Sequence, residues 1–360
     1  MKNLLFFASD FKIGLSALLT DQLIALHDAE INVTAVAGEN EQEPGLSMLL
    51  SSKNINIQRI NGLDEHREFK RLVNEISEIV KKNDIDLIHV QNNWQLAIAS
   101  AVKLKSRKNL KIAYTLHGFR HNHPFKSRIA QIIIGTALLM LADNVICMTE
   151  FLKHKFKLLS YKIKLIPLGV KESYFDVTFM SAPIDSLHLI FPAQFREGKN
   201  QDVIIKAFSD FINLTGNKKA TLTLPGNGPL LEKMKSLAQQ LDIQDRVIFP
   251  GFVSKEKIKD LYLKSNIAIV ASNSETFGQS IVEPFVLGRC VLSTPVGVTP
   301  EIIENGINGY IFNNKEDLVD ILTKIDINQL NRIGENNFKC RDKFRWKEIA
   351  KNYNQLLLKQ

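Results

Sequence analysis

Short runs of aliphatic residues alternate along this chain with longer segments in which apolar side chains recur every three or four positions. This alternation is typical of a parallel β-sheet whose strands are joined by helices that cover its faces. Strands are predicted in the first half at residues 3–8, 31–37, 55–60, 86–90, 111–116 and 144–149. A second series is predicted at residues 164–168, 187–193, 220–226, 246–251, 267–272, 290–294 and 310–312. Two such series predict an α/β protein with two doubly wound domains and a ligand cleft between them.

The connecting segments have the periodicity of one-sided helices. In residues 68–83, apolar side chains recur at the spacing of one helix face, at Phe69, Leu72, Val73, Ile76, Ile79 and Val80.

A stretch of mixed Gly, Pro, Ser and charged residues at 168–186 lacks clear periodicity and is predicted to join the two domains. The first domain then comprises residues 1–172 and the second residues 173–335. Residues 336–360 end in an amphipathic segment and are expected to return toward the first domain as a packing helix.

The composition is that of an ordinary globular protein, with 45% apolar and 23% charged residues in a chain of 360. The three cysteines, Cys147, Cys290 and Cys340, are far apart, which favours reduced thiols and a cytoplasmic location. The first apolar run fits a buried strand better than a signal peptide. The most apolar later stretch, residues 129–142, is too short to span a bilayer.

The net charge of +8 is compatible with three kinds of partner: nucleic acid, an anionic membrane or a phosphorylated substrate. The basic residues are not confined to one tail, and no known nucleic-acid-binding motif accompanies them, so no nucleic acid is predicted. Residues 120–135 combine basic and apolar side chains. Two interpretations remain open for this segment: peripheral contact with an anionic membrane, or a core helix preceded by charges.

Glycines and cations follow the predicted strands of the second half, where a doubly wound domain binds its ligands. Arg196 and Lys199 lie beside a glycine, and two such cations suit a diphosphate, although a solvated loop would have the same composition. Gly226 begins a Gly-Asn-Gly-Pro sequence that fits either a backbone cradle for an anion or a tight turn before a helix. Phe252 lies in a loop whose backbone could read a nucleobase edge, or could simply lead into a helix.

Two acids, Glu275 and Glu283, flank a Phe-Gly-Gln turn after the strand predicted at residues 267–272. Ser280 and Glu283 have the spacing of a capping box, with Pro284 tolerated in the first turn of the helix. A cap explains neither Glu275 nor the turn, whose amides could bind hydroxyl and phosphate oxygens. A carboxylate beside them can accept paired hydrogen bonds from sugar hydroxyls. The pattern therefore favours a ligand site.

Residues 275–309, ETFGQSIVEPFVLGRCVLSTPVGVTPEIIENGING, resemble the E-x7-E region of retaining glycosyltransferases of the GT-B fold, glycosyltransferase family 4. Further segments resemble the same family: LIPLGV at the domain boundary, the GNGP turn, RVIFPGFV and the closing FRWKEIAKNY. Together these segments cover most of residues 110–355. The resemblance implies two Rossmann-like domains facing across a cleft, the second of which binds a nucleotide sugar.

The resemblance also implies roles for single residues. Glu283 would hold the ribose hydroxyls of the nucleotide, and Glu275 would contact hydroxyls of the donor sugar. Lys199 would pair with the diphosphate. The donor-binding surface would further include Phe277, Gly278, Gln279, Gly226 and Phe252, the first three through amides that meet the sugar and the diphosphate.

Two positions depart from the family pattern. The arginine usual five residues before the lysine is replaced here by Gln194, and Arg196 would be its substitute. Pro284 replaces the small residue that usually follows the second acid.

In the first half, His117, His121 and His123 follow a predicted strand. The family often has a histidine near the reacting sugar, which predicts a catalytic role for His117, with a structural hydrogen bond as the alternative. No acid or cysteine completes a metal site, and the family needs no metal, so none is predicted. Gly14 stands where the family usually carries a richer glycine loop.

The resemblance implies a metal-independent hexosyltransferase without a cofactor. It would move a hexose or N-acetylhexosamine from a nucleotide-diphosphate sugar, with a UDP-sugar favoured, to a glycan or lipid-linked saccharide in bacterial surface polysaccharide assembly, such as lipopolysaccharide or capsule. It would act in the cytoplasm, with peripheral contact at the inner face of the membrane. Nucleotide-sugar 2-epimerases, inverting transferases and non-catalytic binding modules remain alternatives. A dinucleotide-dependent oxidoreductase is disfavoured because no G-x-G-x-x-G follows a strand.

Overall fold

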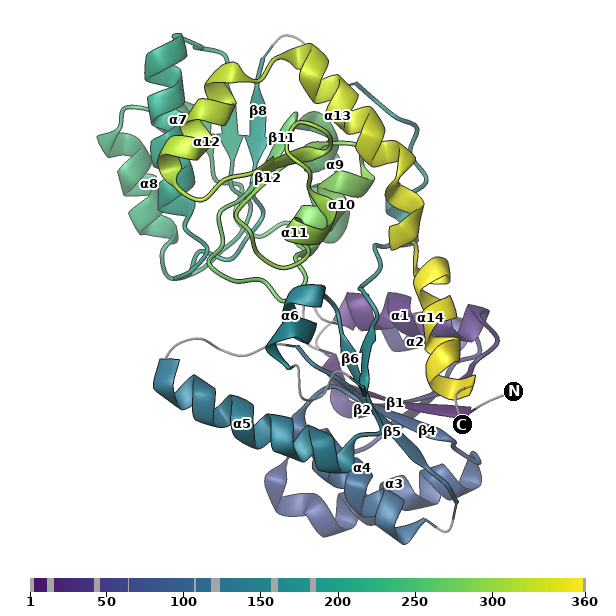
Figure 1. Cartoon of the computed structure of the whole chain (residues 1–360). Helices are drawn as coiled ribbons and strands as arrows, with labels where there is room; N and C mark the ends of the chain where they lie inside the picture. The colour runs from purple at the N-terminus through teal and green to yellow at the C-terminus, as the bar shows by residue number, and fades with distance from the viewer. Residues whose placement is uncertain are drawn as a thin grey trace. The chain divides into compact units, whose positions relative to one another are not determined.

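The computed structural model describes residues 3–11, 16–41, 46–63, 65–106, 108–117, 124–156, 161–181 and 186–358. The chain forms two compact units (Figure 1). The first unit comprises residues 1–171 and 345–360, and the second comprises residues 172–344. Each unit contains one parallel β-sheet covered by helices, which confirms the predicted α/β class with two doubly wound sheets.

The sheet of the first unit has the strand order β3-β2-β1-β4-β5-β6-β7. Its strands are β1 (Asn3–Phe11), β2 (Asn32–Glu41), β3 (Asn56–Arg59), β4 (Leu87–Val90), β5 (Lys111–Thr115), β6 (Asn144–Cys147) and β7 (Ile163–Leu165). The helices are α1 (Ser16–Asp28), α2 (Leu46–Ser52), α3 (Phe69–Lys82), α4 (Asn93–Lys105), α5 (Pro124–Leu141), α6 (Glu150–Lys155) and α14 (Trp346–Leu358). The order reverses between β1 and β4, which is the switch point where such sheets bind ligands.

The core of the first unit lies on both faces of this sheet, because successive side chains of a strand point to opposite sides. Leu5 and Phe7 of β1 belong to the apolar cluster that includes the buried side chains of α3 and α4. Leu4 and Phe6 belong to the cluster that includes residues of α1 and α14. The helix predicted at residues 68–83 is confirmed as α3. Four of its six predicted apolar positions are buried, Ile79 is partly buried and Phe69 is 37% exposed.

The sheet of the second unit repeats this topology in the order β10-β9-β8-β11-β12-β13. Its strands are β8 (His188–Ile190), β9 (Thr221–Thr223), β10 (Val247–Ile248), β11 (Ile267–Val270), β12 (Cys290–Ser293) and β13 (Gly309–Ile311). The helices are α7 (Gln201–Thr215), α8 (Leu231–Gln240), α9 (Lys255–Lys264), α10 (Gln279–Val286), α11 (Thr299–Ile302), α12 (Lys315–Lys324) and α13 (Ile327–Lys339). The switch point of this sheet lies between β8 and β11.

One predicted strand belongs to the other sheet. The run at residues 164–168 was assigned to the second series, but β7 pairs with β6 in the first sheet, with Val145 opposite Ile163. The amide of Ile166 continues this pairing by donating to Cys147 O at 2.9 Å. The assignment was wrong because periodicity indicates a strand without indicating its neighbour.

None of the described helices is long and apolar enough to cross a membrane. Of the three free cysteines, Cys147 and Cys290 are buried and Cys340 is exposed.

The C-terminal helix α14 packs beside α1 in the first unit (Figure 1). Its Tyr353 hydroxyl is hydrogen-bonded to the side-chain amide of Gln22 in α1. At the start of the helix, the buried ring of Trp346 lies against Gly169, where a Cβ atom would be 2.4 Å from Cδ2 of the indole. The close approach of this ring therefore requires a residue without a side chain at position 169.

We predict that Gly169→Ala lowers the melting temperature by at least about 3 °C, because overpacking a well-filled core costs about 1–3 kcal/mol. Gly135→Ala is the matched control, since its Cβ would meet nothing closer than 3.9 Å. Alanine in that helix should leave the melting temperature unchanged or slightly higher. Thermal denaturation followed by circular dichroism measures both variants, and an unaltered melting temperature in Gly169→Ala would contradict the packing described.

Candidate functional site

Two loops of the second unit flank its switch point, one after β8 and one after β11. Asn200 in the first loop has a left-handed backbone, and its side-chain amide donates to Ala271 O at 2.7 Å and to Asn273 Oδ1 at 2.6 Å in the second. The amide of Asn273 donates in return to Gly198 O at 2.8 Å. These hydrogen bonds tie the loops together, so the side chains that they carry are held in a fixed relation.

The tied loops bring together two of the predicted catalytic residues, Lys199 and Glu275. Lys199 Nζ lies 2.5 Å from Glu275 Oε1, and the same carboxylate oxygen accepts a hydrogen bond from Ser272 Oγ at 2.7 Å. The side chains of the ion pair are only 13% and 16% exposed. Each charge compensates the other's loss of hydration, and removing one partner would leave the other uncompensated.

The Phe-Gly-Gln turn follows Glu275 and is fixed by a buried side chain and by a backbone hydrogen bond. The Phe277 side chain is buried, and its carbonyl accepts a hydrogen bond from Val298 N at 2.8 Å, which ties it to the S-T-P-V-G segment. Gly278 has a φ of +100°, a left-handed conformation that glycine adopts at little cost. This conformation lets the chain turn directly into α10.

Helix α10 begins at Gln279, with Gly278 as its N-cap and without a side-chain cap. The predicted capping box is therefore wrong: Ser280 is the second residue of the helix, and Glu283 lies in its second turn, ahead of Pro284. The capping motif fails because the left-handed glycine starts the helix before Ser280. An N-terminus without a side-chain cap directs its backbone amides toward the loop, an arrangement suited to an anion.

The second acid, Glu283, lies in a different environment from Glu275. It is partly buried, and burial raises its pKa to about 7, opposed by the charge of Lys255. Burial, and secondarily the Glu283 charge, raise the pKa values of Tyr174 and Tyr262 above the ordinary tyrosine value. The fully buried Tyr262 hydroxyl has no hydrogen-bond partner among the described residues. Lys255 therefore influences this carboxyl, and the carboxyl in turn influences the two phenols.

Sequence reasoning missed both tyrosines. Tyr174 falls in the segment that we predicted as a linker, and Tyr262 has the position of an ordinary core residue in α9. No motif marks either residue. Ser254, by contrast, has the residue type of an ordinary N-cap and caps α9, with its hydroxyl accepting from Lys257 N at 3.4 Å.

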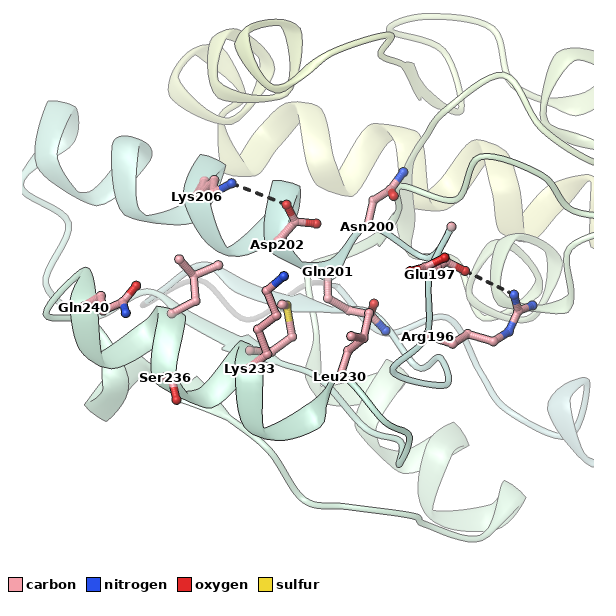
Figure 2. A pocket seen from close by; sticks show the side chains of 13 residues that line it. Arg196, Glu197, Asn200, Gln201, Asp202, Lys206, Leu230, Lys233, Ser236 and Gln240 are labelled. Atoms are coloured by element: carbon pink, nitrogen blue, oxygen red, sulfur yellow. Dashed lines mark hydrogen bonds and ion pairs between the residues drawn. The ribbon is translucent and has the colours of Figure 1, made fainter. Parts of the chain in front are cut away.

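Arg196 does not point into the ion pair of Lys199 and Glu275 but lines a separate groove. Its exposed guanidinium donates to Glu197 O at 3.3 Å, and it lines a groove of about 400 Å³ between α7 and α8, together with Lys206 and Lys233 (Figure 2). Neither Lys199 nor Glu275 is among the described residues that line this groove. The structure thus pairs Lys199 with Glu275 and places Arg196 in the groove.

Two further predicted positions lie in loops that follow β9 and β10. The backbone amide of Gly226 donates to Gly251 O at 2.8 Å. This amide is the donor that a bound anion would need, and the hydrogen bond to Gly251 already occupies it. This geometry favours the tight-turn interpretation of Gly226. Phe252 follows this glycine carbonyl, and its side chain is 67% exposed.

In the first unit, His117 follows β5 and is partly buried. Its Nε2 lies 2.7 Å from Oε1 of Gln91, a residue that follows β4. Burial lowers the pKa of His117 to about 4, so the imidazole is neutral at physiological pH. Gly14, His121 and His123 lie outside the described residues. Within the described ranges, no group of three or more His, Cys, Asp or Glu side chains could hold a metal ion.

Two family models match the chain. The model described as Glycosyltransferase Family 4 matches residues 14–174, and the model described as Glycosyl transferases group 1 matches residues 181–340. Together they cover nearly the whole chain.

Two curated relatives are similar to this chain at about a quarter sequence identity. The alpha-monoglucosyldiacylglycerol synthase of Streptococcus pneumoniae is 25% identical over 264 residues, which are 67% of this chain and 59% of that protein. The N-acetyl-alpha-D-glucosaminyl L-malate synthase of Bacillus anthracis is 27% identical over 256 residues, 67% of this chain and 64% of that protein. The chain thus spans about three fifths of the length of these relatives.

Solved structures match over the full length of the chain. HepE of Anabaena in complex with UDP and glucose has a TM-score of 0.78 at 18% identity, with 99% of each chain covered. Sucrose-phosphate synthase of Thermosynechococcus elongatus has a TM-score of 0.74 at 17% identity, with 99% of this chain and 98% of that chain covered. These likenesses show a GT-B fold. With family models matching both of its Rossmann-like units, the chain belongs to glycosyltransferase family 4.

Proposed function

We propose that this protein transfers a hexose or N-acetylhexosamine from a nucleotide-diphosphate sugar to a hydroxyl of a glycan or lipid-linked saccharide, with retention of the anomeric configuration. The observation that carries this proposal is the pairing of Lys199 with Glu275 at the switch point of the second unit. A cation and a carboxylate held there match the two ends of the bond to be broken, the anionic diphosphate and the hydroxyl-rich sugar.

The diphosphate would be bound by Lys199 and by the N-terminal amides of α10. Lys199 is a point charge for phosphate oxygens, and the α10 N-terminus carries no side-chain cap that would compete for its amides. Their combined positive potential would stabilise the leaving group as its negative charge develops, without a metal ion. On binding, Lys199 would exchange its contact with Glu275 for one with phosphate. Activity that persists in the presence of EDTA would support this part of the proposal.

Glu275 would accept hydrogen bonds from hydroxyls of the donor sugar and stabilise positive charge on its ring. The bond between the anomeric carbon and the diphosphate oxygen breaks, and the acceptor oxygen forms its bond on the same face. The acceptor proton passes to the departing phosphate oxygen, so no covalent intermediate with Glu275 is required. His117, a neutral imidazole in the first unit, would contact the reacting sugar.

Glu283 would bind the ribose hydroxyls of the nucleotide, near the phenols of Tyr174 and Tyr262. We propose a UDP-sugar as the donor, because solved relatives of this fold bind UDP and UDP-glucose. A place in bacterial surface polysaccharide assembly, as in lipopolysaccharide or capsule, is supported by a likeness to two proteins. One is the lipopolysaccharide outer core galactosyltransferase WaaB, and the other is a 41.2 kDa protein in the cps region of Klebsiella pneumoniae.

Helix α5 would contact an anionic membrane from the cytoplasmic side, where a lipid-linked acceptor is held. Ile132, Ile133 and Met140 are 69%, 63% and 77% exposed, and their spacing places them on one face of the helix. Leu138, at a different angle, is fully buried and anchors the helix to the first unit. An exposed apolar stripe suits a lipid surface, and the basic residues in the sequence of segment 120–135 would favour an anionic one.

We predict that Glu275→Gln lowers kcat by about 10²–10³-fold, the usual effect of removing one electrostatic contact to a transition state. Release of UDP from UDP-glucose, UDP-galactose and UDP-N-acetylglucosamine in the presence of a saccharide acceptor measures turnover. The double variant Lys199→Met/Glu275→Gln removes both charges, so no uncompensated charge remains to destabilise the fold. Loss of activity in this variant therefore reports on the chemistry and not on misfolding.

Near-wild-type turnover of Glu275→Gln with the correct donor would contradict its assigned role. Analysis of the product anomer tests the reaction class. An inverted product would indicate an inverting transferase, and a 2-epimer formed without transfer would indicate an epimerase.

We predict that UDP binding strengthens roughly tenfold between pH 6 and pH 8, because ribose hydroxyls donate to an ionised Glu283 and its pKa lies at about 7. The raised pKa also means that the unliganded native state holds a proton that the unfolded state has lost. The stability from this group is present below pH 4.5 and is lost as the pH rises through 7. Titration calorimetry with UDP compares wild type with Glu283→Gln. The same pH dependence in both would contradict this account.

We predict that the double variant Ile132→Gln/Ile133→Gln reduces co-sedimentation with vesicles that contain anionic phospholipid by at least about fivefold, because two large apolar side chains leave the interface. Leu214→Gln is the matched control, since Leu214 is 70% exposed but lies in α7 of the second unit. Equal binding of all three proteins, or equal binding to purely zwitterionic vesicles, would contradict the assignment.

A further inference from the structure

Gln91 lies at the switch point of the first unit, directly after β4. Its backbone amide donates to Oε1 of the fully buried Gln95 at 2.8 Å. The backbone amide of Gln95 donates in turn to Oδ1 of Asn92, the N-cap of α4, at 2.9 Å. The position of Gln91 is thus fixed by the capping structure of α4, at the place where a doubly wound sheet meets its ligand.

The side-chain amide of Gln91 bridges two histidines. Its Oε1 lies 2.7 Å from His117 Nε2, and its Nε2 lies 3.4 Å from His89 Nε2. His89 is only 1% exposed, and the same ring nitrogen lies 2.6 Å from the hydroxyl of Thr115. A continuous polar chain therefore runs from the buried His89 of β4 to His117 after β5.

The chemistry of these groups decides where the protons are. An amide nitrogen only donates, so Nε2 of His89 must accept from Gln91, and it can accept from the Thr115 hydroxyl as well. His89 is neutral, since burial, together with the charge of His117, lowers its pKa to about 3. The amide oxygen of Gln91 only accepts, so Nε2 of His117 must carry the proton that it receives. In a neutral imidazole the other nitrogen, Nδ1, is then the acceptor.

We propose that Gln91 is a positioning residue that holds His117 as the neutral Nε2–H imidazole, so that Nδ1 accepts a hydrogen bond from a sugar hydroxyl. The inference rests on the proposed function for its second part, the contact with a sugar. A glutamine keeps His117 neutral with its proton on Nε2, whereas a glutamate in its place would not. A carboxylate beside Nε2 would favour the imidazolium, in which both nitrogens donate and the acceptor is lost.

The test uses the full-length protein labelled with ¹⁵N-histidine, with the His117 signals assigned by their loss in His117→Asn. In wild type, long-range ¹H–¹⁵N spectra at pH 7 should show the Nε2–H tautomer of a neutral ring. In Gln91→Glu, the titration midpoint of His117 should rise by at least one pH unit above its wild-type value. Asn93→Asp is the matched control, because it places the same charge two residues away, on a side chain whose Oδ1 accepts a hydrogen bond from the Tyr114 hydroxyl at 2.9 Å. Its His117 midpoint should stay within a few tenths of a unit of wild type.

An Nδ1–H tautomer in wild type would overturn the proposal even if Gln91→Glu failed to fold. An equal midpoint in wild type and Gln91→Glu, or an equal rise in Asn93→Asp, would also overturn it. With UDP-glucose as the donor probe, kcat of Gln91→Glu should fall at least about fivefold below wild type at one pH unit below the variant's His117 midpoint, where the ring is about nine-tenths imidazolium in the variant and at least half neutral in wild type. Equal kcat at that pH despite the shifted midpoint would refute the contact with a sugar. Absence of any transfer by wild type would instead count against the proposed function, while the spectra would still decide the positioning role.

Discussion

The candidate donor site depends on the hydrogen bonds that tie together the two loops at the switch point of the second unit. Asn200 and Asn273 carry these bonds, and they hold a lysine and a glutamate at ion-pair distance while little of either side chain is exposed. A parallel sheet brings strand ends to one edge but leaves the loops between them free to diverge. The crossed amide contacts remove that freedom, and the pair then keeps each of the two charges compensated until a ligand arrives.

The fold could be predicted well from the sequence, because buried parallel strands are short aliphatic runs bounded by turns. Every predicted run coincides with a strand of one of the two sheets. The failure at residues 164–168 has a physical reason: pairing between strands depends on tertiary contacts that leave no periodic trace. For the same reason, no pattern in the sequence indicated that Trp346 packs on Gly169.

The site could be predicted in part. The resemblance led to Lys199 and Glu275, and the structure pairs them. The capping box failed because the backbone conformation of Gly278, rather than the spacing of polar residues, determines where α10 begins. Gln91 and Tyr262 belong to no motif, since their importance comes from neighbours that are distant in sequence. Arg196 shows the limit of reasoning from spacing: only two residues separate it from Lys199, yet it lines a different surface.

We propose that the cation paired with Glu275 binds the donor diphosphate. Titration calorimetry of UDP against wild type, Lys199→Met and Lys206→Met tests it most directly, because Lys206 lies in the same helix–loop segment but lines the groove between α7 and α8. Affinity for UDP should fall at least tenfold in Lys199→Met and should be unchanged in Lys206→Met. Equal affinity in wild type and Lys199→Met would contradict it.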